Sequence, residues 1–426
     1  MRRAGSFAIW PRSALVLPLL LLPLLLLLVL AGCATPPAPP PWRDSPAAVA
    51  DQHRNGLPHT DRLGQPRRQL DPVRSFFPLI LDNAMVDYSR GLRFGFAAAY
   101  EAGFNAVSPW SGQPRNAALA AAAGSRLLLA LNPEEAAAAR AEDGADLQAL
   151  LDARTVRLVR IMPFSARGPE ASSPADIASP ADIDSALNAL RQAVAQRPND
   201  PAWSVLQAFA APAIGLRLPS SAEARALAYG ALIGGASGLI WLGEDSYVSR
   251  SGGALGIGPA LPLDYGVQLP ESEQGPPFKP EPAQVGQARA LWQTVARLNR
   301  EIERLSPALL SPTAQTPPRA ELLPLDDGPP LAEGETPIRL LLKQQDGVQP
   351  GGQIGGQIGG QIGGHLTLLA ANLSHRPWRL RISLPGGIKR LERWFDTDPA
   401  PALNAGNRQF EEDFPPLGVR VYRLTP

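Results

Sequence analysis

The sequence predicts an α/β domain built on a parallel sheet, followed by a small antiparallel β-sandwich. Short apolar segments alternate with helical segments of about a dozen residues through the middle of the chain, which is typical of βα units. From residue 312 onward the apolar period changes to two, as in strands with one buried face. With 426 residues and 45 % hydrophobic residues, the chain can form cores for both parts.

The α/β part is expected over residues 72–311, where six strand–helix units are recognisable. Their strands are predicted in "SFFPLILD", "FNAVSPW", "SRLLLALNP", "TVRLVRIMPF", "AWSVLQAF" and "ASGLIWL". Helices are expected between them, including a short one at Ala145–Ala153 and one that begins after Ser220, where Glu223 has capping-box spacing. A (β/α)8 barrel needs eight units over about 250 residues. We therefore predict a TIM-like (β/α)8 barrel that is complete or lacks some units.

A long amphipathic helix is predicted in "VGQARALWQTVARLNREIERL". Its apolar face comprises Leu291, Val295, Leu298, Ile302 and Leu305. Residues 312–426 are then expected to form the β-sandwich, with strands in "IRLLLKQQ", "HLTLLAANL", "WRLRISLP" and "GVRVYRL". The glycine-rich repeat at 351–364 lies between two of these strands and is expected to be a flexible hairpin tip.

The N-terminus is typical of an exported protein. Basic residues precede a long apolar run that ends at Cys33, so residues 1–32 are predicted to be a signal peptide. "LAGC" resembles the bacterial lipobox, which implies cleavage before Cys33 and acylation of its thiol. The alternative is an uncleaved membrane-spanning helix. Residues 33–71 are proline-rich and predict a tether. Ala34 after the cysteine, by resemblance to lipoprotein sorting signals, implies an outer-membrane anchor facing the periplasm.

Several kinds of chemistry lack support in the sequence. The net charge of +1 gives no argument for a nucleic-acid partner. The four histidines show no metal-binding spacing, so no metal site is expected. No phosphate-binding loop or nucleophile elbow is recognisable, and "GGALGIG" lacks the strand-to-helix context of a dinucleotide site. We therefore expect no cofactor. The only cysteine is the one assigned to lipidation.

Three stretches carry a resemblance to a known family. They are "AGFNAVSPW", "PAWSVLQAFAAPAIGLRLPSSAEARALAYGALIGGASGLIWL" and "LTLLAANLSHRPWRLRISLPG". In order and character they resemble glycoside-hydrolase-like TIM-barrel proteins with a C-terminal β-sandwich, over about residues 76–426. The resemblance implies a carbohydrate substrate or ligand, bound at the carboxyl ends of the barrel strands.

Glycoside hydrolysis usually needs two carboxylates across the scissile bond. Candidates at the predicted strand ends are Asp82, Glu134, Glu170, Glu244 and Asp245. We expect Glu244 to be catalytic, because Trp241 and Tyr247 flank it and aromatic faces stack on sugars. Asp82 is its expected partner.

Other residues at these strand ends are candidate sugar contacts. We expect Trp110, Trp241 and Tyr247 to contact the ligand, and Gln207 to be either a ligand contact or a buried hydrogen-bonding brace. Arg225 and Tyr229, one helical turn apart, fit a structural role better than a functional one.

One departure from the resembled family opens an alternative function. After the fourth recognisable strand, active relatives often carry a motif resembling Asp-Glu-Pro, but here the chain reads "PFSARGPEASSP". The alternative is a lipoprotein that binds a glycan, or acts as a scaffold, without catalysis.

Overall fold

The structure is a computed structural model. It describes residues 77–84, 96–109, 122, 125–130, 150–151, 157–164, 180–196, 202–211, 215–242, 256–257, 282–311, 313–314, 316–323, 337–344, 365–396, 399–404 and 408–425. The chain divides into two units, Met1–Arg43 and Asp44–Pro426, and every described residue belongs to the second. None of the described helices has the length and apolar character needed to cross a membrane.

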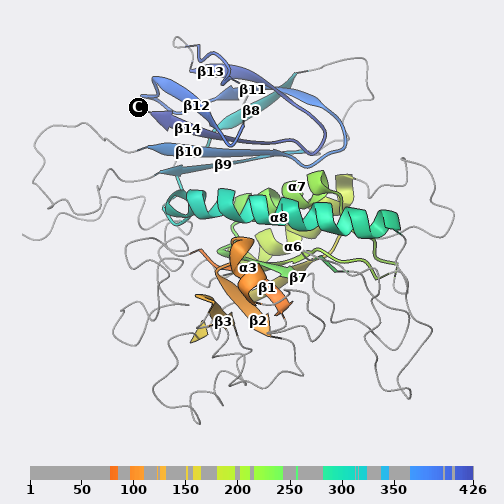
Figure 1. Ribbon diagram of the computed structural model, residues 1–426. Helices are drawn as coiled ribbons and strands as arrows, with labels where there is room; N and C mark the ends of the chain where they lie inside the picture. Colours follow the sequence, from red (N-terminus) through yellow and green to blue (C-terminus); the bar gives the residue numbers. More distant parts are fainter. Residues whose placement is uncertain are drawn as a thin grey trace, which may run out of the picture. The chain divides into compact units, whose positions relative to one another are not determined.

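The first part of the described chain forms a parallel sheet of seven strands (Figure 1). The strands are β1 Leu79–Ala84, β2 Ala106–Pro109, β3 Leu128–Ala130, β4 Leu150–Leu151, β5 Arg157–Ile161, β6 Ala202–Gln207 and β7 Gly238–Leu242. Their order in the sheet is β4-β3-β2-β1-β7-β6-β5. The first and last strands in sequence are therefore neighbours, and among the described strands only the step from β4 to β5 lacks pairing. This is the cyclic order of a barrel, open at one seam.

The six predicted strands of this part are confirmed, and β4 corrects one prediction. Leu150–Leu151 lies inside Ala145–Ala153, which we expected to be helical, and it pairs in parallel with Leu129 and Ala130 of β3. A short apolar run fits either a helix or a strand, and here its pairing with β3 makes it a strand. Asp82 lies within β1 and not at its end, because the strand continues to Ala84.

The sheet buries apolar residues on both faces, as parallel sheets do. One face packs against the helices through Leu79, Leu206, Leu239 and others. The described helices are α3 Phe96–Glu101, α6 Pro180–Gln196, α7 Ser221–Ile233 and α8 Pro282–Leu309. The opposite face, here called the inner face, carries a second cluster around Trp203 and Ile240.

At the open seam the inner face is exposed. Leu158 of β5 is the register partner of Trp203, and Arg160 is the partner of Val205. Their side chains therefore belong to the inner face. Leu158 is nevertheless 57 % exposed, whereas Val205 is 4 % exposed. Within the described part of the chain, no strand covers β5 on its outer edge.

Capping residues mark the start of α7 and the end of α3. Ser220 caps α7, its hydroxyl accepting from the Glu223 amide, while the Glu223 side chain accepts from the Ser220 amide. Gly103, with φ of +79°, follows the short helix α3. The predicted apolar face of α8 is confirmed, because all five residues named for it are buried.

The C-terminal part is a sandwich of two antiparallel sheets, as predicted. One sheet contains β9 Ile338–Gln344, β10 Leu366–Asn372, β12 Arg390–Trp394 and β14 Val419–Thr425; the other contains β8 Arg319–Leu323, β11 Trp378–Ser383 and β13 Gln409–Phe414. Both sheets contribute to one core, which includes Leu368, Ile382 and Phe410. The glycine-rich repeat lies outside the described residues, but Gln344 and Leu366 on either side of it are register partners, as in a hairpin.

The four-stranded sheet of the sandwich is buried on its second face as well. Leu369 of β10 and Val421 of β14 join the same core as helices α7 and α8, which lie between the parallel sheet and β9–β10 (Figure 1). Gly230 of α7 permits this approach, because an added Cβ would lie 2.5 Å from Leu187 Cδ1 of α6 and 3.2 Å from Leu373 Cδ2. The two parts of the chain therefore share one core.

Candidate functional site

Two residues predicted near strand ends, Asp82 and Gln207, form one row with Leu242 across the parallel sheet. Asp82 of β1 is the register partner of Leu242 in β7, and Leu242 is also the partner of Gln207 in β6. Register partners on parallel strands face the same side, about 4.8 Å apart. The row belongs to the inner face, since Ile80 and Ile240, two residues earlier on their strands, are in the inner cluster. It lies at the carboxyl edge, where α/β proteins place their sites.

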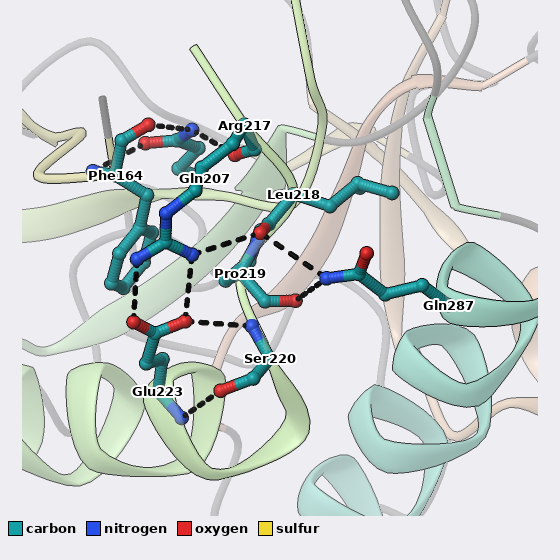
Figure 2. A network of polar contacts seen from close by, with 8 residues as sticks. All are labelled: Phe164, Gln207, Arg217, Leu218, Pro219, Ser220, Glu223 and Gln287. Atoms are coloured by element: carbon teal, nitrogen blue, oxygen red, sulfur yellow. Dashed lines mark hydrogen bonds and ion pairs between the residues drawn. The ribbon is translucent and has the colours of Figure 1, made fainter. Parts of the chain in front are cut away.

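Gln207 is committed to hydrogen bonds within the chain. It is fully buried, and its Oε1 accepts from the Phe164 amide at 3.1 Å. Its Nε2 donates to the carbonyls of Phe164 at 3.1 Å and Arg217 at 2.9 Å, with a longer contact of 3.3 Å to Phe209. Figure 2 shows how the amide joins two loops that follow β5 and β6. Of the two roles considered for Gln207, this geometry is that of the buried brace.

Arg217, whose carbonyl accepts from Gln207, also forms an ion pair with Glu223 in the first turn of α7 (Figure 2). The guanidinium of Arg217 lies over the Phe164 ring, 5.3 Å from its centroid, and donates to both carboxylate oxygens of Glu223 at 2.6 and 2.9 Å. Glu223 also accepts from the Ser220 amide at 2.8 Å. Gln287 of α8 donates to the Leu218 carbonyl at 3.4 Å. These contacts fix the loop between β6 and α7 at the carboxyl edge of the sheet.

Glu223 is held in its ionised form. Burial raises the pKa of its carboxyl group, but the hydrogen bond and charge of Arg217, together with hydrogen bonds from Ser220, bring the pKa below its ordinary value. A buried carboxylate with all these partners is a structural group and not a proton donor for a ligand. The sequence predicted its role in the cap but not its pairing with Arg217.

Trp241 corrects an expectation. Its side chain is fully buried in the core beneath the helices. Side chains alternate along β7, so Trp241 faces the helices whereas Ile240 and Leu242 face the inner side. In this structure the indole is part of the packing and presents no face to a sugar.

Arg225 and Tyr229 have the structural role that was favoured for them. Arg225 Nη1 donates to both carboxylate oxygens of Glu301 in α8, at 2.9 and 2.7 Å, and the Tyr229 hydroxyl donates to the second at 3.0 Å. Burial, and then the negative charge of Glu301, raises the pKa of Tyr229 well above its ordinary range. The three side chains tie α7 to α8.

The remaining predicted site residues lie outside the described part of the chain. These are Cys33, Trp110, Glu134, Glu170, Glu244, Asp245 and Tyr247. In the sequence, Trp110 directly follows the last residue of β2, and Glu244 follows the last residue of β7 by two positions. Among the described residues, no group of three or more His, Cys, Asp or Glu is arranged to hold a metal ion.

Comparisons with known proteins give only distant structural similarity. No protein-family model matches the chain, and no curated protein matches its sequence. A proposed α-galactosidase of Bacteroides fragilis aligns over 89 % of this chain and 75 % of its own, with 8 % identity and a TM-score of 0.31. AmyP, solved in complex with maltose, aligns over 82 % of this chain and 97 % of its own, with 9 % identity and a TM-score of 0.35. An Anoxybacillus α-amylase covers 75 % of this chain and 58 % of its own, with 13 % identity and a TM-score of 0.24. We therefore argue function from the residues of this chain alone.

Proposed function

We propose that this chain is a lipid-anchored envelope protein whose α/β domain hydrolyses a glycan at the carboxyl edge of its parallel sheet. The observation that carries the proposal is the pairing of Asp82 with Leu242. It makes the strand that carries Asp82 the direct neighbour of the strand that leads to Glu244. In the proposal, these two acidic residues, far apart in the sequence, approach each other at the carboxyl edge of the two strands.

This arrangement suits the chemistry of glycoside cleavage. One carboxylic acid protonates the leaving oxygen, and a second carboxylate attacks the sugar or activates water; their separation is about 5–5.5 Å in retaining enzymes and about 6.5–9.5 Å in inverting ones. Neighbouring strands lie about 4.8 Å apart, so side chains at adjacent ends span this range. In the proposal Glu244 and Asp82 share these two roles.

We also propose that two aromatic residues contact the sugar at the same edge. Trp110 comes directly after β2, which pairs with β1 beside Asp82. Tyr247 follows Glu244 in the segment after β7. We further propose that β4 and β5 approach each other and complete a barrel, which would bring the loops after all seven strands to one rim. The cyclic strand order supports this step.

The anchor is the second element of the proposal. The basic start, the apolar run and "LAGC" support lipidation of Cys33 and delivery to the cell envelope, with outer-membrane attachment facing the periplasm. Metabolic labelling with palmitate tests this directly. The wild type should incorporate label and Cys33→Ser should not; equal labelling of both would contradict the anchor.

Release of reducing sugar from a panel of envelope and extracellular glycans tests the hydrolase. We expect activity in the wild type and a loss of at least about 100-fold in Glu244→Gln and in Asp82→Asn, as for removal of an acid–base group. Glu303→Gln changes an exposed carboxylate on α8 and should leave the activity intact. Equal activity of Glu244→Gln and wild type would reject the site.

A non-catalytic glycan-binding protein is the second candidate. It is favoured by one observation: Asp82 is the only carboxylate in the row of Asp82, Leu242 and Gln207, and Gln207 is bound within the chain. This candidate predicts that the wild type binds a glycan of the panel in a pull-down assay and releases no sugar from it. Turnover by the wild type would exclude it.

A further inference from the structure

A hollow lies on the helical side of the parallel sheet, between α3 and α8. It has a volume of about 380 Å³ and is lined by described residues only. Its apolar lining consists of Ala98, Ala102, Ala296 and Trp292. The hollow exists because alanines stand where larger side chains would fill the space between the helices. Typical small-molecule pockets begin at about 300 Å³.

Trp292, which lines this hollow, is packed in the core. It is 7 % exposed, and its ring lies 5.9 Å from that of Phe104, tilted by 34°. At the end of α3, Asn299 Nδ2 donates to the Ala102 carbonyl at 3.2 Å. Contacts within the protein therefore hold Trp292 and Ala102 in the lining of the hollow.

The rim of the hollow is cationic. Arg297 and Arg300, one turn apart on α8, both line it, and Glu101 is the single carboxylate among the lining residues. Arg297 donates to the Thr294 hydroxyl at 3.1 Å, and Arg300 donates to the Glu101 carbonyl at 3.0 Å. Neither guanidinium forms an ion pair within the described part of the chain. Arg300 also serves as a cap for α3, whereas among the described residues Arg297 has the Thr294 hydroxyl as its hydrogen-bond partner.

We propose that this hollow binds a monosaccharide that carries a carboxylate or phosphate group. The acidic group pairs with Arg297 and Arg300, because guanidinium matches the planar geometry of oxyanions. The sugar body covers the alanines and Trp292, and Gln293, which also lines the hollow, offers a donor and an acceptor to its hydroxyls. The site lies on the helical side of the sheet, opposite the inner face of Asp82. The test of this binding site is therefore independent of the test of the proposed hydrolase site.

Calorimetric titration of the full chain in detergent solution tests the site. The probes are two acidic sugars, glucuronate and glucose 6-phosphate. Glucose is the uncharged control, and inorganic phosphate is the control that carries the charge but lacks the sugar ring. We expect both acidic sugars to bind at least about tenfold more tightly than glucose or phosphate, the size of one charge-assisted hydrogen bond. Whichever acidic sugar binds with the higher affinity shows whether the ligand is a sugar acid or a sugar phosphate.

Three variants distinguish binding in the hollow from the effects of a lost charge or of lower stability. Arg297→Gln should weaken binding of the acidic sugars about tenfold without changing the thermal unfolding midpoint. Arg289→Gln, which removes the same charge from an exposed position of α8 outside the hollow, should leave binding unchanged. Ala98→Leu should fill the hollow and abolish binding. Acidic sugars that bind no better than glucose or phosphate, or equal effects of Arg297→Gln and Arg289→Gln, would overturn the proposal.

Discussion

Asp82 of β1 and Leu242 of β7 are register partners in the parallel sheet, although they lie near opposite ends of the α/β part of the sequence. This pairing joins the first strand to the last and gives the sheet its cyclic order. It also places the one described carboxylate of the row beside the strand that leads to Glu244. The proposed chemistry depends on this relationship more than on any single side chain.

Replacing Gln207 by leucine should destabilise the fold strongly. The change leaves the Phe164 amide and the Arg217 carbonyl without their buried partner, whereas the Phe164 carbonyl still accepts from the Arg217 amide at 3.1 Å. Each unsatisfied buried group costs about 1–3 kcal/mol, so we expect the two groups together to cost at least about 2 kcal/mol in denaturant unfolding. Gln196→Leu, at an exposed helix end, is the control. A loss below about 1 kcal/mol would show that Gln207 is not a brace.

Stability should depend on pH through Glu223. Its pKa in the folded state lies below the ordinary value of 4.5, so its ionised form stabilises the fold above that pH. This contribution is lost as the pH falls through the lowered pKa. In urea unfolding, the wild type should exceed Glu223→Gln in stability near neutral pH, and the gap should narrow below pH 4.5. A gap that widens on acidification would contradict the Arg217–Glu223 pairing.

Two glycines should respond to alanine in opposite ways. At Gly238 an added Cβ would lie 2.7 Å from Trp203 Cδ1 and 3.1 Å from Pro78 Cβ, both in rigid groups, so Gly238→Ala should cost about 1–3 kcal/mol. At Gly286, within α8, it would meet nothing within 4 Å. Gly286→Ala should therefore stabilise the protein by about 0.5–1 kcal/mol. Thermal unfolding of both variants checks the pair, and a neutral Gly238→Ala would contradict the described packing.

The α/β part and the sandwich should unfold together. Leu369 of β10 is fully buried in the core that also contains α7 and α8. Leu369→Ala should cost about 2–5 kcal/mol and shift one calorimetric transition that reports on the whole described protein. Two separate transitions, with only the later or the earlier one shifted, would show that the parts have independent cores.

Much of the fold could be predicted from the sequence because apolar residues recur at regular spacings in many of its segments. The long helix α8 and the alternating strands of the sandwich have faces that follow directly from residue spacing. The capping box at Ser220 and Glu223 marked the start of α7. These are local features, and each segment carries its own signal.

The parts that could not be predicted depend on contacts distant in sequence. The two-residue strand β4 is defined only by its pairing with β3. Alternation along β7 shows that Trp241 and Leu242 face opposite sides, but only the assembled sheet shows which side holds the helices. Gln207 could not be assigned as a brace because two of its partners are backbone carbonyls of residues 164 and 217.

The central claim is that Asp82 and Glu244 meet at one rim, and a thiol cross-link measures this directly. In the Cys33→Ser background, Asp82→Cys with Glu244→Cys is treated with a bifunctional thiol reagent that spans about 5–10 Å, the range of paired glycosidase carboxylates. Asp82→Cys with Glu303→Cys, which places the second thiol on α8 at the helical side, is the control. We predict rapid intramolecular linkage for the first pair and none for the second. Absence of linkage between positions 82 and 244 in the folded protein would contradict the account.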